Sequence, residues 1–230
     1  MIDLQDTDKP VVCIFSGGLD STVLIYALVK KYKSENVKAI GFNYGQRHST
    51  ELSKAVKTAE KLGVDYKIID ISFVSDIVKD VCSLSAASTV RLPTDSESSA
   101  DVQANFVVPF RNLIFQSIAL SYAESLRSEI VYLGVQNGDN HGFWDCRGEY
   151  YTELNKLTAL NDKYKIKVLT PLIDFSKAQE IVLGRELGVD FRDTWTCYNG
   201  GEKPCGICHS CAERLRAFQS LGLKDPLMED

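Results

Sequence analysis

Residues 11–22 read Val-Val-Cys-Ile-Phe-Ser-Gly-Gly-Leu-Asp-Ser-Thr, and this stretch decides the fold. Residues 11–15 are apolar and rich in β-branched side chains, which is typical of a short buried strand. From Thr22 the sequence continues as a long apolar run that predicts a buried helix. Between them lie two glycines, a carboxylate and two serines. A glycine-rich turn before a helix N-terminus lets the backbone approach a phosphate, so the stretch predicts an anion site.

The residues of this turn determine which type of phosphate loop it resembles. A Walker loop needs a lysine after its last glycine and a dinucleotide loop needs Gly-x-Gly-x-x-Gly, and neither pattern fits here. An ordinary turn capped by Ser or Asp is the alternative to an anion site. The full stretch Ser16 to Ser21 instead resembles the Ser-Gly-Gly-x-Asp-Ser loop of the ATP-pyrophosphatase (PP-loop) superfamily. That resemblance implies bound ATP, transfer of AMP to a nucleophile, and magnesium held with the help of Asp20.

The composition is that of an ordinary globular protein, with 230 residues, 44% of them hydrophobic and 25% charged. This length suits one α/β domain with a small appendage. The formal net charge of −5 gives no broad basic field, so nucleic acid is not expected as a partner. The acidic N-terminus carries no long apolar run, which predicts neither a signal peptide nor a membrane span. We therefore expect a cytoplasmic protein.

The rest of the chain alternates between strand and helix patterns. Further strands are predicted over residues 37–43, 66–71, 130–135 and 168–173, and helices over residues 50–62, 113–126 and 150–163. A capping box at Ser176 predicts the start of one more helix. Gly63 is the expected C-terminal cap of the helix over residues 50–62, and Asn112 is the expected N-terminal cap of the helix over residues 113–126. The helix over residues 113–126 is apolar nearly all round and is expected to be central and buried. The pattern predicts an α/β fold with a doubly wound parallel sheet over residues 1–195, followed by a tail over residues 196–230.

Two polar loops follow predicted strands, where ligands bind in doubly wound sheets. The first, residues 44–48, contains Tyr44, Gln46 and Arg47, with His48 either a ligand or simply solvated. The second, residues 136–148, can hold a flat heterocycle between aromatic side chains and bind a carboxylate through an arginine. Its candidate substrate-binding residues are Phe143, Trp144, Asp145 and Arg147. The Ser-rich connection over residues 83–104 is either disordered or a lid over the site.

Two cations occupy positions that a phosphate would explain. Arg111 lies at the entrance of a buried helix and therefore needs an anionic partner, either a phosphate or a structural carboxylate. Lys177 lies in the first turn of its helix, where a cation opposes the helix dipole. That placement is explained if the lysine points at a phosphate, and a freely solvated lysine is the alternative.

Four of the seven cysteines lie within fifteen residues of the tail. Cys197, Cys205, Cys208 and Cys211 are spaced as the ligands of a closed tetrahedral zinc site, which is structural because no coordination position stays open. An iron–sulfur cluster is the main alternative, and His209 is a substitute ligand. The odd number of cysteines argues against a disulfide framework. Of the others, Cys13 is expected to be buried, and Cys146 is either reactive or packed.

Together these motifs closely resemble the 7-cyano-7-deazaguanine synthase family of PP-loop enzymes over nearly the whole chain. The matching segments are residues 16–21, 44–49, 108–112, 145–147, 177–178 and 197–211. The resemblance implies a commonly homodimeric enzyme with structural zinc. Enzymes of this family convert 7-carboxy-7-deazaguanine, ammonia and ATP to the nitrile by adenylation, amide formation and dehydration, and the resemblance implies the same reaction here. Asp20, Arg111 and Lys177 would be catalytic, and the nucleotide would be bound by Phe15, Ser16, Gly17, Gly18, Leu19, Asp20, Ser21, Thr22, Tyr44, Gln46 and Arg47.

Three departures from the family pattern keep an alternative open. Phe110 stands where the family commonly has glycine, Phe143-Trp144 replaces Tyr-Pro, and the spacing between Cys197 and Cys205 is about one residue shorter. The first two place bulky aromatic side chains beside the expected substrate. A related antiphage-type ligase would keep adenylation but stop at the amide or join the carboxylate to a protein amine. A tRNA-thiolating PP-loop enzyme and a non-catalytic nucleotide-binding scaffold are the remaining alternatives.

Overall fold

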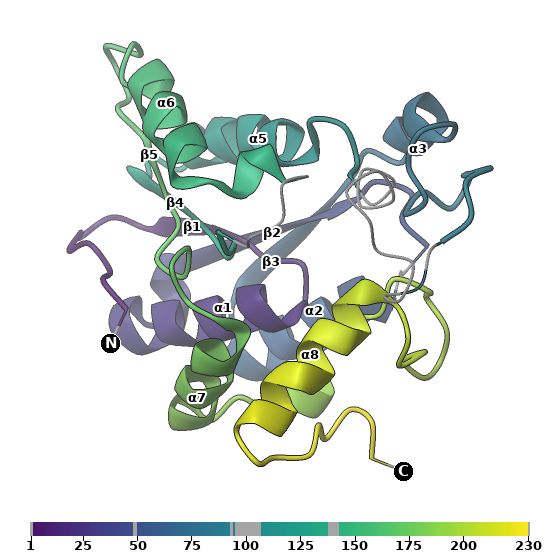
Figure 1. The fold of residues 1–230 in the computed structure, drawn as a ribbon. Coiled ribbons are helices and arrows are strands. Elements are labelled where there is room, and N and C mark those ends of the chain that lie inside the picture. The colour runs from purple at the N-terminus through teal and green to yellow at the C-terminus, as the bar shows by residue number, and fades with distance from the viewer. Residues whose placement is uncertain (1, 48–49, 93, 95–106, 138–142, 230) are drawn as a thin grey trace.

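The structure, a computed structural model, describes residues 2–47, 50–92, 94, 107–137 and 143–229. Five strands form one parallel sheet in the order β3-β2-β1-β4-β5. They are β1 (Val11–Ile14), β2 (Val37–Asn43), β3 (Asp65–Asp70), β4 (Ile130–Leu133) and β5 (Lys167–Leu169). This confirms the predicted doubly wound α/β fold (Figure 1).

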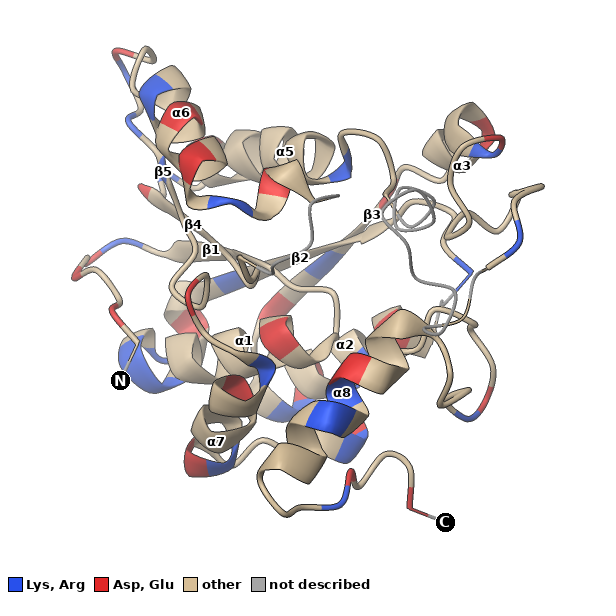
Figure 2. Ribbon diagram, viewed as in Figure 1, with Lys and Arg blue, Asp and Glu red and all other residues tan. Residues whose placement is uncertain are grey.

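Helices cover both faces of this sheet (Figure 1). In chain order the α-helices are α1 (Leu19–Tyr32), α2 (Thr50–Leu62), α3 (Phe73–Val78), α5 (Arg111–Ser125), α6 (Gly148–Thr158), α7 (Lys177–Leu187) and α8 (His209–Ser220). Short 3-10 helices are η1 (Ser34–Asn36), η4 (Trp144–Cys146) and η5 (Phe191–Asp193). Charges of both signs are interspersed along α6, α7 and α8 (Figure 2). No helix among the described residues is long and apolar enough to cross a membrane.

Strand β1 shows why the sheet is buried on both faces. Its alternate residues Val12 and Ile14 pack under α5 and α6, while Val11 and Cys13 pack against α1 and α2. All four side chains are at most 5% exposed. Because successive side chains of a strand point to opposite faces, a continuous apolar run is what a central parallel strand requires.

The strands that follow β1 in the chain are placed on both of its sides. From β1 the chain passes through α1 to β2 and then β3 on one side, whereas β4 and β5 are added on the other side of β1. Such a switch point leaves a crevice at the carboxyl ends of the strands, where ligands bind in this architecture. The Ser16–Ser21 turn lies at this crevice because it directly follows β1.

Several predicted boundaries are confirmed. Residues 37–43 form β2 and residues 50–62 form α2, as expected. Gly63 ends α2 with a left-handed φ of 67°, the conformation that glycine adopts most easily. The capping box at Ser176 is present, since its side chain accepts from the Gln179 N–H and the Gln179 side chain accepts from the Ser176 N–H.

Other boundaries were wrong, mostly at the ends of strands. The third strand begins and ends one residue earlier than predicted, and β1, β4 and β5 end before Phe15, Val135 and Ile173 respectively. Beyond β5 the chain turns, with the Ile173 N–H donating to Thr170 O at 3.0 Å. Pro171 within that turn has no N–H for a sheet ladder. The helix predicted over residues 150–163 is α6, which starts and ends earlier.

The helix predicted from Leu113 to Leu126 differs most from its expectation. It begins at Arg111, and Phe110 rather than Asn112 occupies the N-cap position, with a left-handed φ of 54°. Only one face is buried, formed by Asn112, Gln116, Ala119 and Ala123. The small and polar residues of this face allow α5 to lie close to the sheet, so it covers the sheet instead of crossing the core.

Candidate active site

The predicted phosphate loop folds as a tight turn that continues directly into α1. The helix begins at Leu19, not Thr22, because the Thr22 N–H already donates to Gly18 O at 3.0 Å. Asp20 and Ser21 therefore belong to its first turn, where N–H groups have no partner within the helix. The Ser16 hydroxyl accepts from the Gly18 N–H at 3.1 Å and lies 3.1 Å from the Ser21 hydroxyl. This arrangement can receive an anion at the helix N-terminus.

Two glycines allow this turn to pack closely against its surroundings. Gly17 has a φ of +90°, and a Cβ there would lie 2.3 Å from Glu51 O. Gly134, directly after β4, packs against α1, since its Cβ would meet the Ser21 backbone nitrogen at 3.0 Å. The turn is thus fixed between the start of α2 and the end of β4.

A cavity of about 300 Å³ opens beside this turn at the carboxyl ends of β1 and β4. The structure brings together residues that lie far apart in the sequence. Of the predicted site residues, those that line it are Ser16, Gly18, Leu19, Asp20, Ser21, Tyr44, Arg111, Phe143 and Lys177.

Lys177 reaches from the first turn of α7 to the first turn of α1, where its ammonium pairs with the Asp20 carboxylate. A second carboxylate, Glu180, lies 3.6 Å from the same ammonium and is fully buried. Burial lowers the pKa of Lys177, but Asp20 and Glu180 outweigh it and raise the pKa above its usual value. Burial raises the pKa of Asp20, but Lys177 outweighs it, so the net pKa is lowered and the carboxyl stays ionised.

Arg111 is the second cation of the cavity. Its guanidinium lies over the ring of Tyr44, 5.9 Å from the ring centroid. Burial lowers the pKa of Arg111, but the adjacent Tyr44 hydroxyl outweighs it and keeps the pKa above the usual value. The cavity therefore holds two cations, Arg111 and Lys177, near the N-terminus of α1. It is also lined by three carboxylates, those of Asp20, Glu51 and Glu213. A polyphosphate that binds with a divalent cation suits this mixture of charges.

Other predicted nucleotide-binding residues have structural contacts and do not line the cavity. Phe15 and Thr22 are buried in the core. The buried Gln46 side chain accepts from the Tyr44 N–H and donates to Phe42 O, which shapes the turn after β2. The Arg47 guanidinium donates to the backbone oxygens of Ser85 and Ser88. His48 and half of the predicted lid, residues 93 and 95–104, lie outside the described residues.

The predicted substrate loop is only partly described, because residues 138–142 lie outside the described residues. Trp144 is 41% exposed and meets Phe110 edge-on, with ring centroids 5.5 Å apart. Asp145 is buried and Arg147 is exposed, and neither lines the cavity. Cys146 does line it, and burial raises the pKa of this thiol to about 11, so it is protonated at neutral pH.

The four tail cysteines form a compact cluster whose sulfur atoms all lie within 4.8 Å of one another. A tetrahedral zinc site places its sulfurs about 3.8 Å apart, so this donor set fits zinc. Three backbone N–H groups point at these sulfurs, including those of Asn199 and Cys205 toward Cys197 Sγ at 3.4 and 3.3 Å. Such N–H···S contacts favour thiolates, the form that binds metal.

The tail also forms one wall of the cavity, which sequence reasoning missed. Cysteine spacing predicted a metal site but carried no signal for where the tail would lie. Residues that line the cavity without having been predicted include Glu51, Asn112, Gly134, Trp195, Thr196, Tyr198, His209, Ser210 and Glu213. A weak signal existed for Gly134, since a glycine directly after a predicted strand indicates a close backbone approach.

The parallel sheet with a Ser-Gly-Gly-x-Asp-Ser turn at its switch point defines an α/β protein of the PP-loop type. A solved structure of NMN synthetase from Francisella tularensis has the same fold, with a TM-score of 0.52 and 17% identity over 94% of this chain and 78% of that one. The family model described as "Queuosine biosynthesis protein QueC" matches residues 10–222. This chain belongs to that family.

Two curated relatives are similar over nearly their whole length. The 7-cyano-7-deazaguanine synthase of Pseudoalteromonas atlantica is 42% identical, with 95% of this chain and 98% of the relative covered. The enzyme of the same name from Caldicellulosiruptor saccharolyticus is 40% identical, with 94% of this chain and 93% of the relative covered.

Proposed function

We propose that this protein catalyses the ATP-dependent conversion of 7-carboxy-7-deazaguanine and ammonia to 7-cyano-7-deazaguanine. The observation that carries the proposal is the identity of about 40% to synthases of that name over nearly the whole chain. The cavity supports it chemically, because it combines a helix N-terminus with two partly buried cations.

The first proposed step activates the substrate carboxylate, which is a poor electrophile. A carboxylate oxygen attacks the α-phosphorus of ATP, and pyrophosphate leaves with the electron pair of the broken P–O bond. The N–H groups at the start of α1, with Lys177 and Arg111, offset the charge that grows on the leaving pyrophosphate. The reaction needs positioning and charge rather than a covalent nucleophile from the protein.

The later steps use the same activation a second time. Ammonia attacks the acyl carbon, AMP leaves, and a proton is released to give the amide. The amide oxygen then attacks a second ATP and releases a second pyrophosphate. This intermediate loses two protons from its nitrogen and AMP from its carbon, which forms the C≡N bond. Arg111 and Phe143 are the proposed substrate contacts that line the cavity, and Trp144, Asp145 and Arg147 are proposed from the family pattern.

Two metals belong to the proposal. Asp20 presents an ionised carboxylate to the cavity, and such an oxygen is a ligand that Mg²⁺ prefers. Magnesium held there would supply positive charge beside the phosphates when bound. The cysteine cluster of the tail, within residues 196–230, would hold structural zinc. The homodimer expected from the family resemblance stays a prediction.

A second candidate function is a ligase that stops at the amide or transfers the carboxylate to a protein amine. The observation that favours it is the exposed aromatic pair of Phe110 and Trp144, next to the cavity residues Arg111 and Phe143. Neither ring lines the cavity, but bulk beside it would hinder a second activation at the same carbon.

One incubation separates these functions. The protein is mixed with 7-carboxy-7-deazaguanine, ATP, magnesium and ammonium, and masses of the small molecules and the intact protein are followed. The proposal predicts the nitrile and pyrophosphate. Amide that accumulates without nitrile, or a deazaguanine adduct on protein, would support the ligase instead. Absence of pyrophosphate would argue for a nucleotide-binding scaffold.

A further inference from the structure

Trp195 connects the PP-loop to the cysteine cluster. Its backbone N–H donates to Gly17 O at 3.0 Å, and its indole Nε1–H donates to Cys197 O at 2.9 Å. The side chain is only 2% exposed and packs with Cys197, Cys208 and Cys211. One rigid residue therefore touches both the phosphate-binding turn and a metal-ligand residue.

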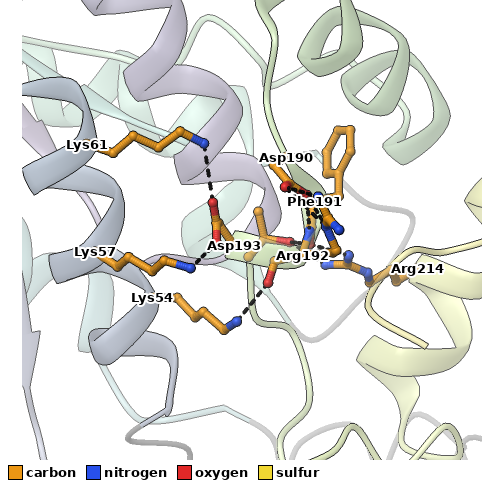
Figure 3. Close-up of polar contacts among 9 residues, drawn as sticks. Lys54, Lys57, Lys61, Asp190, Phe191, Arg192, Asp193 and Arg214 are labelled. Atoms are coloured by element: carbon orange, nitrogen blue, oxygen red, sulfur yellow. Dashed lines mark hydrogen bonds and ion pairs between the residues drawn. The ribbon is translucent and has the colours of Figure 1, made fainter. Parts of the chain in front are cut away.

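Arg214 on α8 holds the residues on both sides of Trp195. The guanidinium is 1% exposed, and its NH1 group donates to the hydroxyls of Thr194 at 2.6 Å and Thr196 at 3.1 Å. Its other donors bind the Asp225 carboxylate at 2.7 and 2.9 Å. They also bind Phe191 O at 3.0 Å (Figure 3). All five guanidinium N–H groups are thereby used, which makes this a fully satisfied buried network.

The same segment is held from the other side by α2. Lys57 and Lys61 pair with the Asp193 carboxylate at 2.8 and 3.4 Å, and the Lys54 ammonium donates to Arg192 O at 2.7 Å (Figure 3). Helix α2 also approaches the PP-loop, because a Cβ on Gly17 would lie 2.7 Å from the Ala55 nitrogen. Residues 191–197 are thus fixed to α2, to α8 and to the PP-loop at once.

We propose that Trp195 is a positioning residue that couples the cysteine cluster to the PP-loop, so that metal binding at one site and ATP binding at the other strengthen each other. The inference rests on the proposed function in one respect, that the PP-loop receives ATP. Such coupling is reciprocal by thermodynamic necessity, so either ligand can report it. A metal bound at the cysteine cluster would hold Cys197 in place. Through the hydrogen bonds of Trp195 and Arg214, it would also restrict the motion of the PP-loop backbone at Gly17.

The first test needs no ATP. Hydrogen exchange is measured by mass spectrometry before and after a chelator removes the metal from the full chain. Faster exchange is expected in the peptide that covers residues 16–22, with no change in α6, which lies on the opposite face of the sheet. Exchange that rises only in the tail, or equally in α6, would overturn the coupling.

The second test measures the rate at which zinc passes to a coloured chelator, with and without MgATP. We expect MgATP to slow release by about fivefold or more in the unmodified chain. Trp195→Phe keeps an aromatic ring but loses the donor to Cys197 O, so the slowing should largely disappear. Tyr164→Phe, which also keeps an aromatic ring and loses its donor but lies between α6 and β5, away from the cavity, should preserve it.

Thr196→Val provides a further variant in case Trp195→Phe does not fold, because it removes one acceptor of Arg214 and leaves the tryptophan in place. It should reduce the MgATP effect as well. An equal MgATP effect in the unmodified chain and both variants would overturn the role of Trp195. If metal removal speeds exchange in the PP-loop but MgATP has no effect on zinc release, the coupling holds and the proposed ATP site is wrong.

Discussion

Among single residues, Gly17 shows most directly how backbone geometry constrains the phosphate loop. We predict that Gly17→Ala costs about 1–2 kcal/mol for its left-handed φ and a further 1–3 kcal/mol for the contact with Glu51 O. Gly63→Ala is the matched control, because its φ is also positive at +67° but its nearest neighbour is Ser34 Oγ at 3.7 Å. Chemical denaturation of both variants measures the difference. Equal losses would show that the close approach at Gly17 is not real.

Asp20 is the residue whose loss should separate activity from folding. Asp20→Ala is expected to reduce pyrophosphate release by about a hundredfold or more, because it removes the carboxylate proposed to hold Mg²⁺ beside the reacting phosphates. Folding should survive, since Glu180 remains 3.6 Å from the Lys177 ammonium and leaves this buried cation a carboxylate. Pyrophosphate release and thermal unfolding are measured on the same sample. A variant that cannot fold would mean that Asp20 is mainly structural.

At the scale of elements, the contact between α2 and η5 predicts a pH dependence of stability. Burial raises the pKa of Asp193, but Lys57 and Lys61 outweigh it and lower the pKa below its usual value. Because the folded-state pKa is lowered, the ion pairs of Asp193 with the two lysines stabilise the protein above the unfolded-state pKa of about 3.9. This stabilisation is lost as the pH falls through the folded-state pKa. Because both lysines are about half exposed or more, Asp193→Asn should cost at most about 1 kcal/mol at pH 7.

That cost should shrink as the pH falls below the unfolded-state pKa of about 3.9 and through the lowered folded-state pKa, because the carboxyl of the unmodified chain is then protonated as well. Urea denaturation at several pH values checks this expectation. Asp162→Asn, an exposed aspartate between α6 and β5, is the control and should show little change at any pH. A difference for Asp193→Asn that stays constant down to pH 3 would contradict the role of its charge.

The tail depends on the four cysteines as a unit. Cys208→Ser should lose bound zinc and destabilise α8, because a structural metal contributes directly to folding. Cys82→Ser replaces another fully buried cysteine, outside the cluster, and should keep its metal even if its stability falls. Metal content and thermal unfolding of both variants give the comparison. Normal zinc content in Cys208→Ser would contradict the ligand assignment.

At the scale of the whole molecule, local signals in the sequence predicted the fold class correctly. The buried run of β1, the glycine-rich turn and the capping box at Ser176 each depend on nearby residues, so the sequence alone reveals them. The ends of strands were less predictable, because pairing stops where the neighbouring strand leaves the sheet. Thus β5 ends at Leu169, although apolar residues continue beyond it.

The wall that the tail adds to the cavity could not be predicted for a similar reason. It depends on long-range contacts, such as Trp195 N–H to Gly17 O and Arg214 to Asp225. No hydrophobic periodicity in the sequence indicates which of these distant residues contact each other. The cysteines were recognised by their spacing, whereas His209 and Glu213 became candidate site residues only when α8 was seen against the PP-loop.

The central claim is that this protein activates a carboxylate as an adenylate, twice for each nitrile. The most direct measurement uses 7-carboxy-7-deazaguanine with both carboxylate oxygens labelled by ¹⁸O, and follows the label by mass spectrometry. The proposed steps predict two AMP molecules per nitrile, each carrying one ¹⁸O, and no label in pyrophosphate. Label in inorganic phosphate together with ADP, or nitrile formed without labelled AMP, would contradict the account.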